Sequence, residues 1–178
     1  MFTYGGGTYS PNNYKHDYRG LVTVRDAVQH SLNLATMRVA ERIGYSRIAA
    51  LAKRLGLNAK IKGYPSLAIG AFEVTPIELA GAYTAFANEG KRSEPHALLR
   101  VVGADGKELK AFKYEPRQVL RPEVAHLMTH LMEGVIDHGT GAGVRARGFK
   151  LPAAGKASAS RMCTLPAGPD RPTRCAAP

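Results

Sequence analysis

Apolar residues recur at helical spacing in five stretches of the chain, with polar residues between them. The helices predicted from this pattern cover about residues 23–30, 34–43, 46–56, 75–90 and 121–139. The fourth has the best-defined beginning, because Thr75, Pro76 and Glu78 form the pattern of a capping box. Thr23 and Ser46 are the expected caps of the first and third helices. The buried face expected for the third helix consists of Ile48, Leu51, Ala52 and Leu55.

Strand patterns are shorter. Residues 98–102 and 108–112 are predicted to pair as a hairpin around Asp105 and Gly106. Residues 149–156 are predicted to form one further short strand. An extended N-terminal segment, a buried connector and a flexible glycine-rich loop are expected at residues 1–20, 65–71 and 139–143.

This mixture of helices and antiparallel strands predicts an α+β fold. A chain of 178 residues can hold one domain with a core, or be a large piece of a bigger domain. Residues 1–156 carry the periodic patterns and are taken as one domain. Residues 157–178 are rich in Ala, Pro, Arg and Ser without periodicity, and we expect a divergent, disordered or loosely attached tail.

Charge and composition limit the partners. A formal net charge of +11 indicates an acidic or anionic partner. No nucleic-acid binding is expected, since no basic run is interleaved with aromatic residues. Cys163 and Cys175 have no accompanying histidine or second cysteine pair, so neither a metal nor another cofactor is expected. The sequence has no apolar run of about 18 residues, and residues 1–7 do not resemble a signal peptide. Any membrane attachment would therefore come through an anchor outside these residues.

The candidate chemistry begins at Ser31-Leu32-Asn33, between the first two predicted helices. A turn there would let a hydroxyl and an amide point into one cleft. The hydroxyl can pass a proton, and the amide can hold a peptide carbonyl or a neighbouring lysine. A simpler interpretation makes Asn33 the cap of the second helix. His30 is interpreted as a surface residue of the last turn rather than a catalytic base.

Taken together, several short sequence motifs resemble those of the transpeptidase domain of the bifunctional (class A) penicillin-binding proteins, which cross-link peptidoglycan. They lie in the family's order at residues 9–14, 22–25, 31–33, 35–36, 65–71, 73–76, 78–80, 86–90, 139–141 and 154–156. The resemblance covers about residues 8–156. It implies the helical lobe and part of the antiparallel sheet of the fold shared by penicillin-binding proteins and serine β-lactamases. It also implies work at the outer face of the cytoplasmic membrane.

The resemblance further implies a mechanism. A serine in a Ser-x-x-Lys motif attacks a D-alanyl-D-alanine stem peptide, releases D-alanine and passes the acyl group to a second stem; β-lactams are ligands of the same site. Ser31 would relay a proton to the leaving amine, and Asn33 would position the substrate amide and the catalytic lysine. Lys156 matches the lysine of the third motif, Lys-Thr-Gly or Lys-Ser-Gly, and would pair with the substrate carboxylate and raise the acidity of Ser31. Ala157 and Ser158 occupy the other two positions of that motif, which contact substrate.

The departures from the family pattern change the expected activity. None of the 178 residues forms a Ser-x-x-Lys motif. Ala157 lacks the expected hydroxyl, Ser158 replaces the expected glycine, and the aromatic strands expected next are absent. We expect a transpeptidase fragment that is inactive alone, and a change of reading frame just after Lys156 would explain the abrupt end of the match.

Two other functions remain open from the sequence. The first is a non-catalytic basic module that binds peptidoglycan or a protein partner, as the net charge suggests. The second is a relative of the serine β-lactamases, which share the three-motif chemistry. The phrases at residues 73–76 and 86–90 favour the penicillin-binding proteins over this second alternative.

Overall fold

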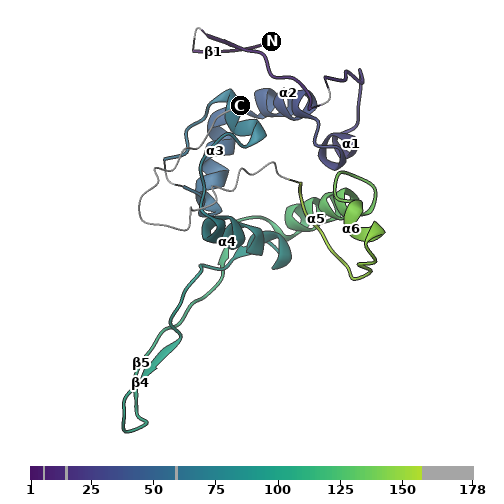
Figure 1. The fold of residues 1–178 in the computed structure, drawn as a ribbon. Coiled ribbons are helices and arrows are strands. Elements are labelled where there is room, and N and C mark those ends of the chain that lie inside the picture. Colours follow the sequence, from purple (N-terminus) through teal and green to yellow (C-terminus); the bar gives the residue numbers. More distant parts are fainter. Residues whose placement is uncertain (6, 15, 59, 158–178) are drawn as a thin grey trace, which may run out of the picture.

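The computed structural model describes residues 1–5, 7–14, 16–58 and 60–157, and it has the expected α+β composition. The helices are α1 Val24–Gln29, α2 Asn33–Ile43, α3 Tyr45–Arg54, the 3-10 helix η1 Pro65–Ile69, α4 Pro76–Ala87, α5 Pro122–Asp137 and α6 Gly143–Ala146 (Figure 1). The strands are β1 Phe2–Tyr4, β2 Gly7–Tyr9, β3 Lys91–Arg92, β4 Arg100–Val102, β5 Glu108–Ala111 and β6 Arg117–Gln118. Within the described ranges, no helix is long and apolar enough to cross a membrane.

Two helix starts follow from the caps in the sequence. The Thr23 hydroxyl oxygen accepts a hydrogen bond from the backbone N–H of Asp26 at 3.1 Å and caps α1. At α4 the hydroxyl oxygen of Thr75 accepts from the N–H of Glu78 at 3.3 Å, and the Glu78 carboxylate accepts from the N–H of Thr75 at 2.7 Å. This is a complete capping box, so the prediction for α4 is confirmed.

The prediction for α3 was wrong in its cap and in part of its buried face. The helix begins at Tyr45 after Gly44, whose φ of 95° suits glycine, and Ser46 does not cap it. Leu51 lies on the exposed side. The buried face is made by Tyr45, Ala49 and Ala52, because small alanine side chains let the segment around Ile61 approach closely.

The strands form three separate antiparallel pairs, β1–β2, β3–β6 and β4–β5. The predicted hairpin around Asp105 and Gly106 is present as β4–β5, although its strands are shorter than expected. It projects from the helices as an arm (Figure 1). The N-terminal segment, expected to be irregular, instead contains the hairpin β1–β2, whose Phe2 is buried under the Arg38 guanidinium.

The strand predicted at residues 149–156 is also wrong, since this described segment contains no strand. Its backbone bonds to a helix instead: the N–H of Gly155 donates to the carbonyl oxygen of Met132, in α5, at 3.2 Å. No neighbouring strand is available to it in the described structure, and α5 takes that place.

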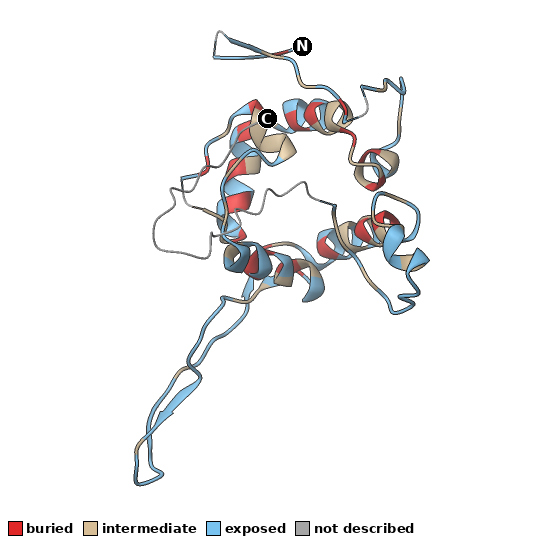
Figure 2. Cartoon of the chain, in the orientation of Figure 1, coloured by how far each residue is buried: buried red, intermediate tan, exposed pale blue. Residues whose placement is uncertain are grey.

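The core lies between the helices, and the arm takes no part in it (Figure 2). Met37 is fully buried, as expected for a core residue. One buried cluster joins α3 to α4 through Leu55, Ala82, Ala85 and Val119. In addition, α1 packs against α2 and α5, and α5 packs against α4 and α6. This packing brings the end of α1 close to the segment that follows α6.

Candidate active site

Ser31 and Lys156 meet although 125 positions separate them in the sequence. The ammonium of Lys156 donates a hydrogen bond to the Ser31 hydroxyl oxygen at 2.7 Å and to the carbonyl oxygen of Ala157 at 3.1 Å. Burial lowers the pKa of Lys156, because a desolvated ammonium is disfavoured. Lys156 forms no ion pair with any carboxylate in the described part of the chain. Its charge is therefore available to an anionic ligand.

The Ser31 side chain is presented by a left-handed turn. Ser31 has a φ of 55°, which is uncommon for a residue other than glycine. Two hydrogen bonds hold the turn on the end of α1, from the N–H of Ser31 to the Val28 carbonyl oxygen at 3.3 Å and from the N–H of Leu32 to the Ala27 carbonyl oxygen at 2.9 Å. Such strain is common at functional sites, where the surrounding structure maintains it.

Asn33 is the first residue of α2, and Leu32 is the cap, so the interpretation of Asn33 as the helix cap is wrong. Its side-chain amide donates to the carbonyl oxygen of Asn12 at 2.8 Å. Among the described residues, no hydrogen bond joins Asn33 to Ser31 or Lys156. The structure thus brings Ser31 and Lys156 together and places Asn33 on the adjoining turn.

Sequence reasoning gave no role to Asn13, which supports this turn. Its Oδ1 accepts from the N–H of Leu34 at 3.1 Å, and its Nδ2 donates to the carbonyl oxygen of Asp17 at 2.6 Å. Asn13 is one of two buried polar residues among those described. The sequence did contain a signal for this role: residues 9–14 are polar and turn-forming, and they are the first of the motifs that resemble the family.

The other residues named from the sequence are Ala157, Ser158, His30 and the two cysteines. Ala157 is exposed and meets Lys156 through its backbone oxygen. Ser158 lies outside the described residues, as do Cys163 and Cys175. His30 is the C-terminal cap residue of α1, with its Nδ1 3.2 Å from the carbonyl oxygen of Asp26. His30 is partly buried rather than fully on the surface.

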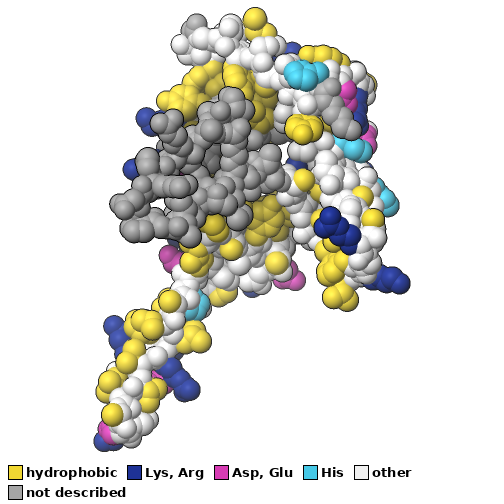
Figure 3. All heavy atoms as spheres, in the orientation of Figure 1, with side chains coloured by type: hydrophobic (Ala, Val, Ile, Leu, Met, Phe, Trp, Pro, Cys, Tyr) yellow, Lys and Arg dark blue, Asp and Glu magenta, His cyan; other side chains and the backbone are white. Residues whose placement is uncertain are grey.

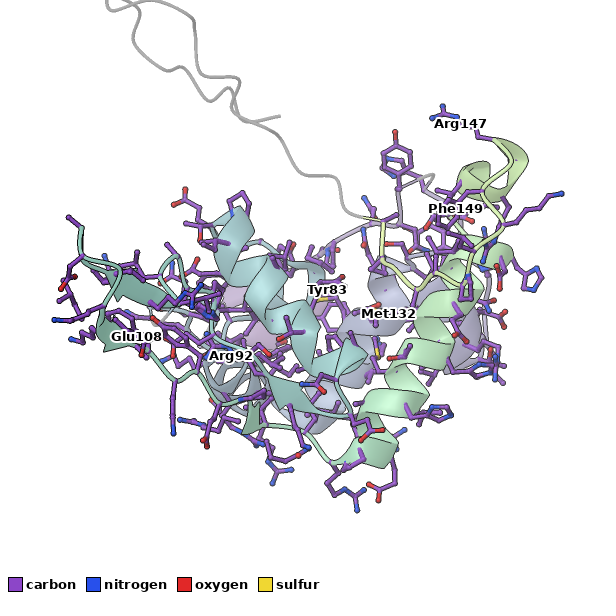
Figure 4. All side chains as sticks on the ribbon, turned by 90° about the horizontal axis from the view of Figure 1, so that it is seen from below. Tyr83, Arg92, Glu108, Met132, Arg147 and Phe149 are labelled. Carbon is purple, nitrogen blue, oxygen red and sulfur yellow. The ribbon has the colours of Figure 1, made fainter. Side chains whose placement is uncertain are left out.

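The chemistry available to the pair follows from charge. A hydrogen bond from an ammonium stabilises developing negative charge on a hydroxyl oxygen and so favours loss of its proton. The same ammonium can bind a carboxylate through its remaining hydrogen. The carbonyl oxygen of Met132 holds Gly155, the residue before Lys156. Figure 4 shows Met132 on the face of α5 that is turned toward the other helices, whereas Arg147 and Phe149 lie farther out.

A family model described as the penicillin-binding protein transpeptidase domain matches residues 2–157. The chain therefore belongs to this family. It is 33% identical to penicillin-binding protein 1A of Aquifex aeolicus over 135 residues, which are 76% of this chain and 18% of that protein. It is 31% identical to penicillin-binding protein 1B of Vibrio cholerae over 152 residues, 85% of this chain and 20% of that protein. The chain thus spans about a fifth of the length of these curated relatives.

Solved structures show the same fold. The crystal structure of penicillin-binding protein 1A from Haemophilus influenzae superposes with a TM-score of 0.76 at 21% identity, covering 84% of this chain and 28% of that one. Penicillin-binding protein A from M. tuberculosis, in its imipenem acyl-enzyme complex, gives 0.65 at 23% identity, covering 75% of this chain and 36% of that one. These likenesses cover only part of each solved chain.

Proposed function

We propose that the chain forms the part of a peptidoglycan D,D-transpeptidase site that carries its second and third motifs, Ser31-Leu32-Asn33 and Lys156. The hydrogen bond from Lys156 to Ser31 is the observation that carries this proposal. Lys156 binds the terminal carboxylate of the stem peptide. Ser31 passes a proton to the leaving D-alanine amine, while Asn33 holds the substrate amide. Ala157 and Ser158 occupy the other two sequence positions of the third motif, next to Lys156.

The nucleophile is not among these 178 residues, because they contain no Ser-x-x-Lys. Ser31 does not replace it, because the residue three positions after it, one helical turn away, is Leu34 and not the lysine base of a Ser-x-x-Lys motif. The chain alone therefore neither cross-links peptidoglycan nor is acylated by penicillin. Its activity belongs to a longer protein that works at the outer face of the cytoplasmic membrane.

The proposed division into residues 1–156 and a divergent tail rests on the loss of periodic patterning after Lys156. A frame change after Lys156 accounts for Ala157 and Ser158 in place of a hydroxyl residue and glycine. Translating the other two frames of the coding DNA beyond the Lys156 codon tests this idea. The absence of a Thr-Gly or Ser-Gly pair and an aromatic strand sequence from both frames would contradict it.

Binding of a peptide that ends in D-Ala-D-Ala tests the proposed site. The full chain, labelled with 13C on its lysines, is titrated with this peptide and with the same peptide amidated at its C-terminus. We expect the Lys156 signal to shift with the free carboxylate only. Equal shifts with both peptides, or none, would contradict the proposal.

The net charge of +11 favours a second candidate, a basic module that binds peptidoglycan or a protein partner. This function predicts peptidoglycan binding that weakens with salt and persists in Lys156→Ala. Intact-mass spectrometry after incubation with penicillin tests whether the chain is acylated. A penicilloyl adduct on the folded chain would contradict the proposed lack of acylation.

A further inference from the structure

The glycine-rich segment after α5, predicted to be a flexible loop, is a hydrogen-bonded turn. The N–H groups of Gly139 and Gly141 both donate to the carbonyl oxygen of Val135, at 3.2 and 2.9 Å. Between them, the N–H of Thr140 donates to the carbonyl oxygen of Gln29, in α1, at 3.0 Å. The turn is therefore fixed to its own helix and also to the end of α1, two residues before Ser31.

Gly139 lies too close to α1 for any side chain. A methyl group at this position would overlap the backbone oxygen of Gln29 and would lie 3.0 Å from the Cα of Val135. Both neighbours are backbone atoms, so neither can rotate away. Larger residues at position 139 would therefore push α1, and the Ser31 turn at its end, away from α5.

Gly141 faces the other partner of the pair. A methyl group there would lie 2.9 Å from the Cδ1 of Ile136. The same Cδ1 would be 3.4 Å from a methyl group on Gly155, so the Ile136 side chain lies between the turn and the residue before Lys156. Gly155 is also bonded to α5 through its N–H. The turn thus contacts the supports of both Ser31 and Lys156.

We propose that Gly139-Thr140-Gly141 is a positioning element that sets Ser31 and Lys156 at hydrogen-bonding distance. The inference rests on the proposed function in that it treats this pair as part of the transpeptidase site. In the described part of the chain, none of these three residues forms a hydrogen bond with Ser31 or Lys156. They act through Gln29 on one side and through Ile136 and Gly155 on the other.

Titration of Lys156 in the full chain tests the proposal. The 13C signal of its ε-carbon, assigned by comparison with Lys156→Arg, is followed against pH. In Gly139→Ala we expect Lys156 to titrate at higher pH than in the wild type, because the separated ammonium becomes solvated. Gly143→Ala is the matched control, since a methyl group there meets no atom within 4 Å, and its titration should equal that of the wild type.

A second variant covers the possibility that Gly139→Ala does not fold. Gly141→Ala meets the flexible end of Ile136, and we expect it to shift the Lys156 titration less. Adding Ile136→Val removes the obstructing Cδ1 and should return the titration partway to that of the wild type, since the Val135 carbonyl oxygen still lies 3.1 Å from the added methyl group. A purely structural role would change the melting temperature and leave the titration of folded Lys156 unchanged.

The outcomes separate the two proposals. An unchanged Lys156 titration in folded Gly139→Ala, or in Gly141→Ala, would overturn the positioning role whatever the peptide does. The proposed function would be overturned if the D-Ala-D-Ala peptide does not shift the Lys156 signal. The positioning role would still hold if the titration of Lys156 changes in Gly139→Ala.

Discussion

Asn13 is bonded to the first turn of α2: its Oδ1 accepts a hydrogen bond from the backbone N–H of Leu34 at 3.1 Å. Helix N-terminal N–H groups have no partner within their own helix, so this bond provides the partner that Leu34 lacks. We predict that Asn13→Ala lowers the free energy of unfolding by about 1–2 kcal/mol, because it leaves a partly buried donor unsatisfied. Urea unfolding followed by circular dichroism measures this change.

The neighbouring Asn12 gives the control for that prediction. Its exposed side chain accepts only a hydrogen bond from the Tyr18 hydroxyl at 3.1 Å in the described structure. Asn12→Ala should therefore cost less than about 0.5 kcal/mol. Equal losses in the two variants would mean that the Leu34 bond does not stabilise the turn before α2.

Gln29 packs over a glycine in α5. A methyl group on Gly134 would overlap the Nε2 of Gln29, which is buried. We predict that Gly134→Ala destabilises the wild type but stabilises the Gln29→Ala variant by up to about 1 kcal/mol, since alanine favours a helix over glycine. The two substitutions should therefore couple by about 1–3 kcal/mol in a double-mutant cycle measured by urea unfolding. Additive effects would show that the two side-chain positions do not meet.

The capping box of α4 gives a prediction of a different kind. Thr75→Ala removes the acceptor of the Glu78 N–H, and we expect a loss of about 1 kcal/mol. Thr75→Ser keeps the hydroxyl and should lose much less stability.

Hydrogen bonds from the backbone and then from the side chain of Thr75 lower the pKa of Glu78. A carboxyl with a lowered pKa stabilises the fold above its unfolded pKa, and this contribution disappears as the pH falls through the folded value. Thermal melts of Thr75→Ala and Thr75→Ser at neutral pH measure how much the capping hydrogen bond contributes to stability.

The same box shows why much of the fold was predictable from the sequence. A capping box is local, so Thr75 and Glu78 define the start of α4 without reference to the rest of the chain. The turn around Asp105 and Gly106 is equally local, and it gave the β4–β5 hairpin. The resemblance added Ser31 and Lys156, and the structure brings those two residues together.

Features that depend on distant packing were missed. Ser46 has the right chemistry for a cap, but the helix is capped two residues earlier, at Gly44. The glycines at 139 and 141 have the composition of a flexible loop, and only contact with Gln29 and Ile136 reveals a fixed turn. Spacing along the sequence contains no information about which atoms a missing Cβ would meet.

The β4–β5 arm exposes apolar side chains far from the pair. Leu99 and Leu109 are 67% and 68% exposed, and Figure 3 shows apolar groups along this arm. A two-stranded ribbon with free edges is a template for association between chains. We predict that Leu99→Lys with Leu109→Lys lowers light scattering at high protein concentration and leaves the Lys156 titration unchanged. Unchanged scattering would place the association surface elsewhere.

The last prediction concerns the cost of burying Lys156. Burial lowers its pKa below the ordinary value of 10.5, so the unfolded chain binds the proton more tightly than the folded chain. Below both pKa values this cost is fully present. Between the folded and the unfolded pKa, the unfolded chain binds more protons, so the contribution of Lys156 to stability rises with pH.

Lys156→Met isolates that contribution. Burial raises the pKa of Tyr45 and of Tyr83, which opposes the trend at high pH, but both chains share this effect and it cancels in their difference. The free energy of unfolding of the wild type minus that of Lys156→Met should therefore rise as the pH increases toward 10.5. Urea titrations at several pH values measure it, with Lys150→Met as a control that removes the side chain of an exposed lysine away from the pair. A difference for Lys156→Met that falls or stays constant would show that the ammonium is solvated and not held against Ser31.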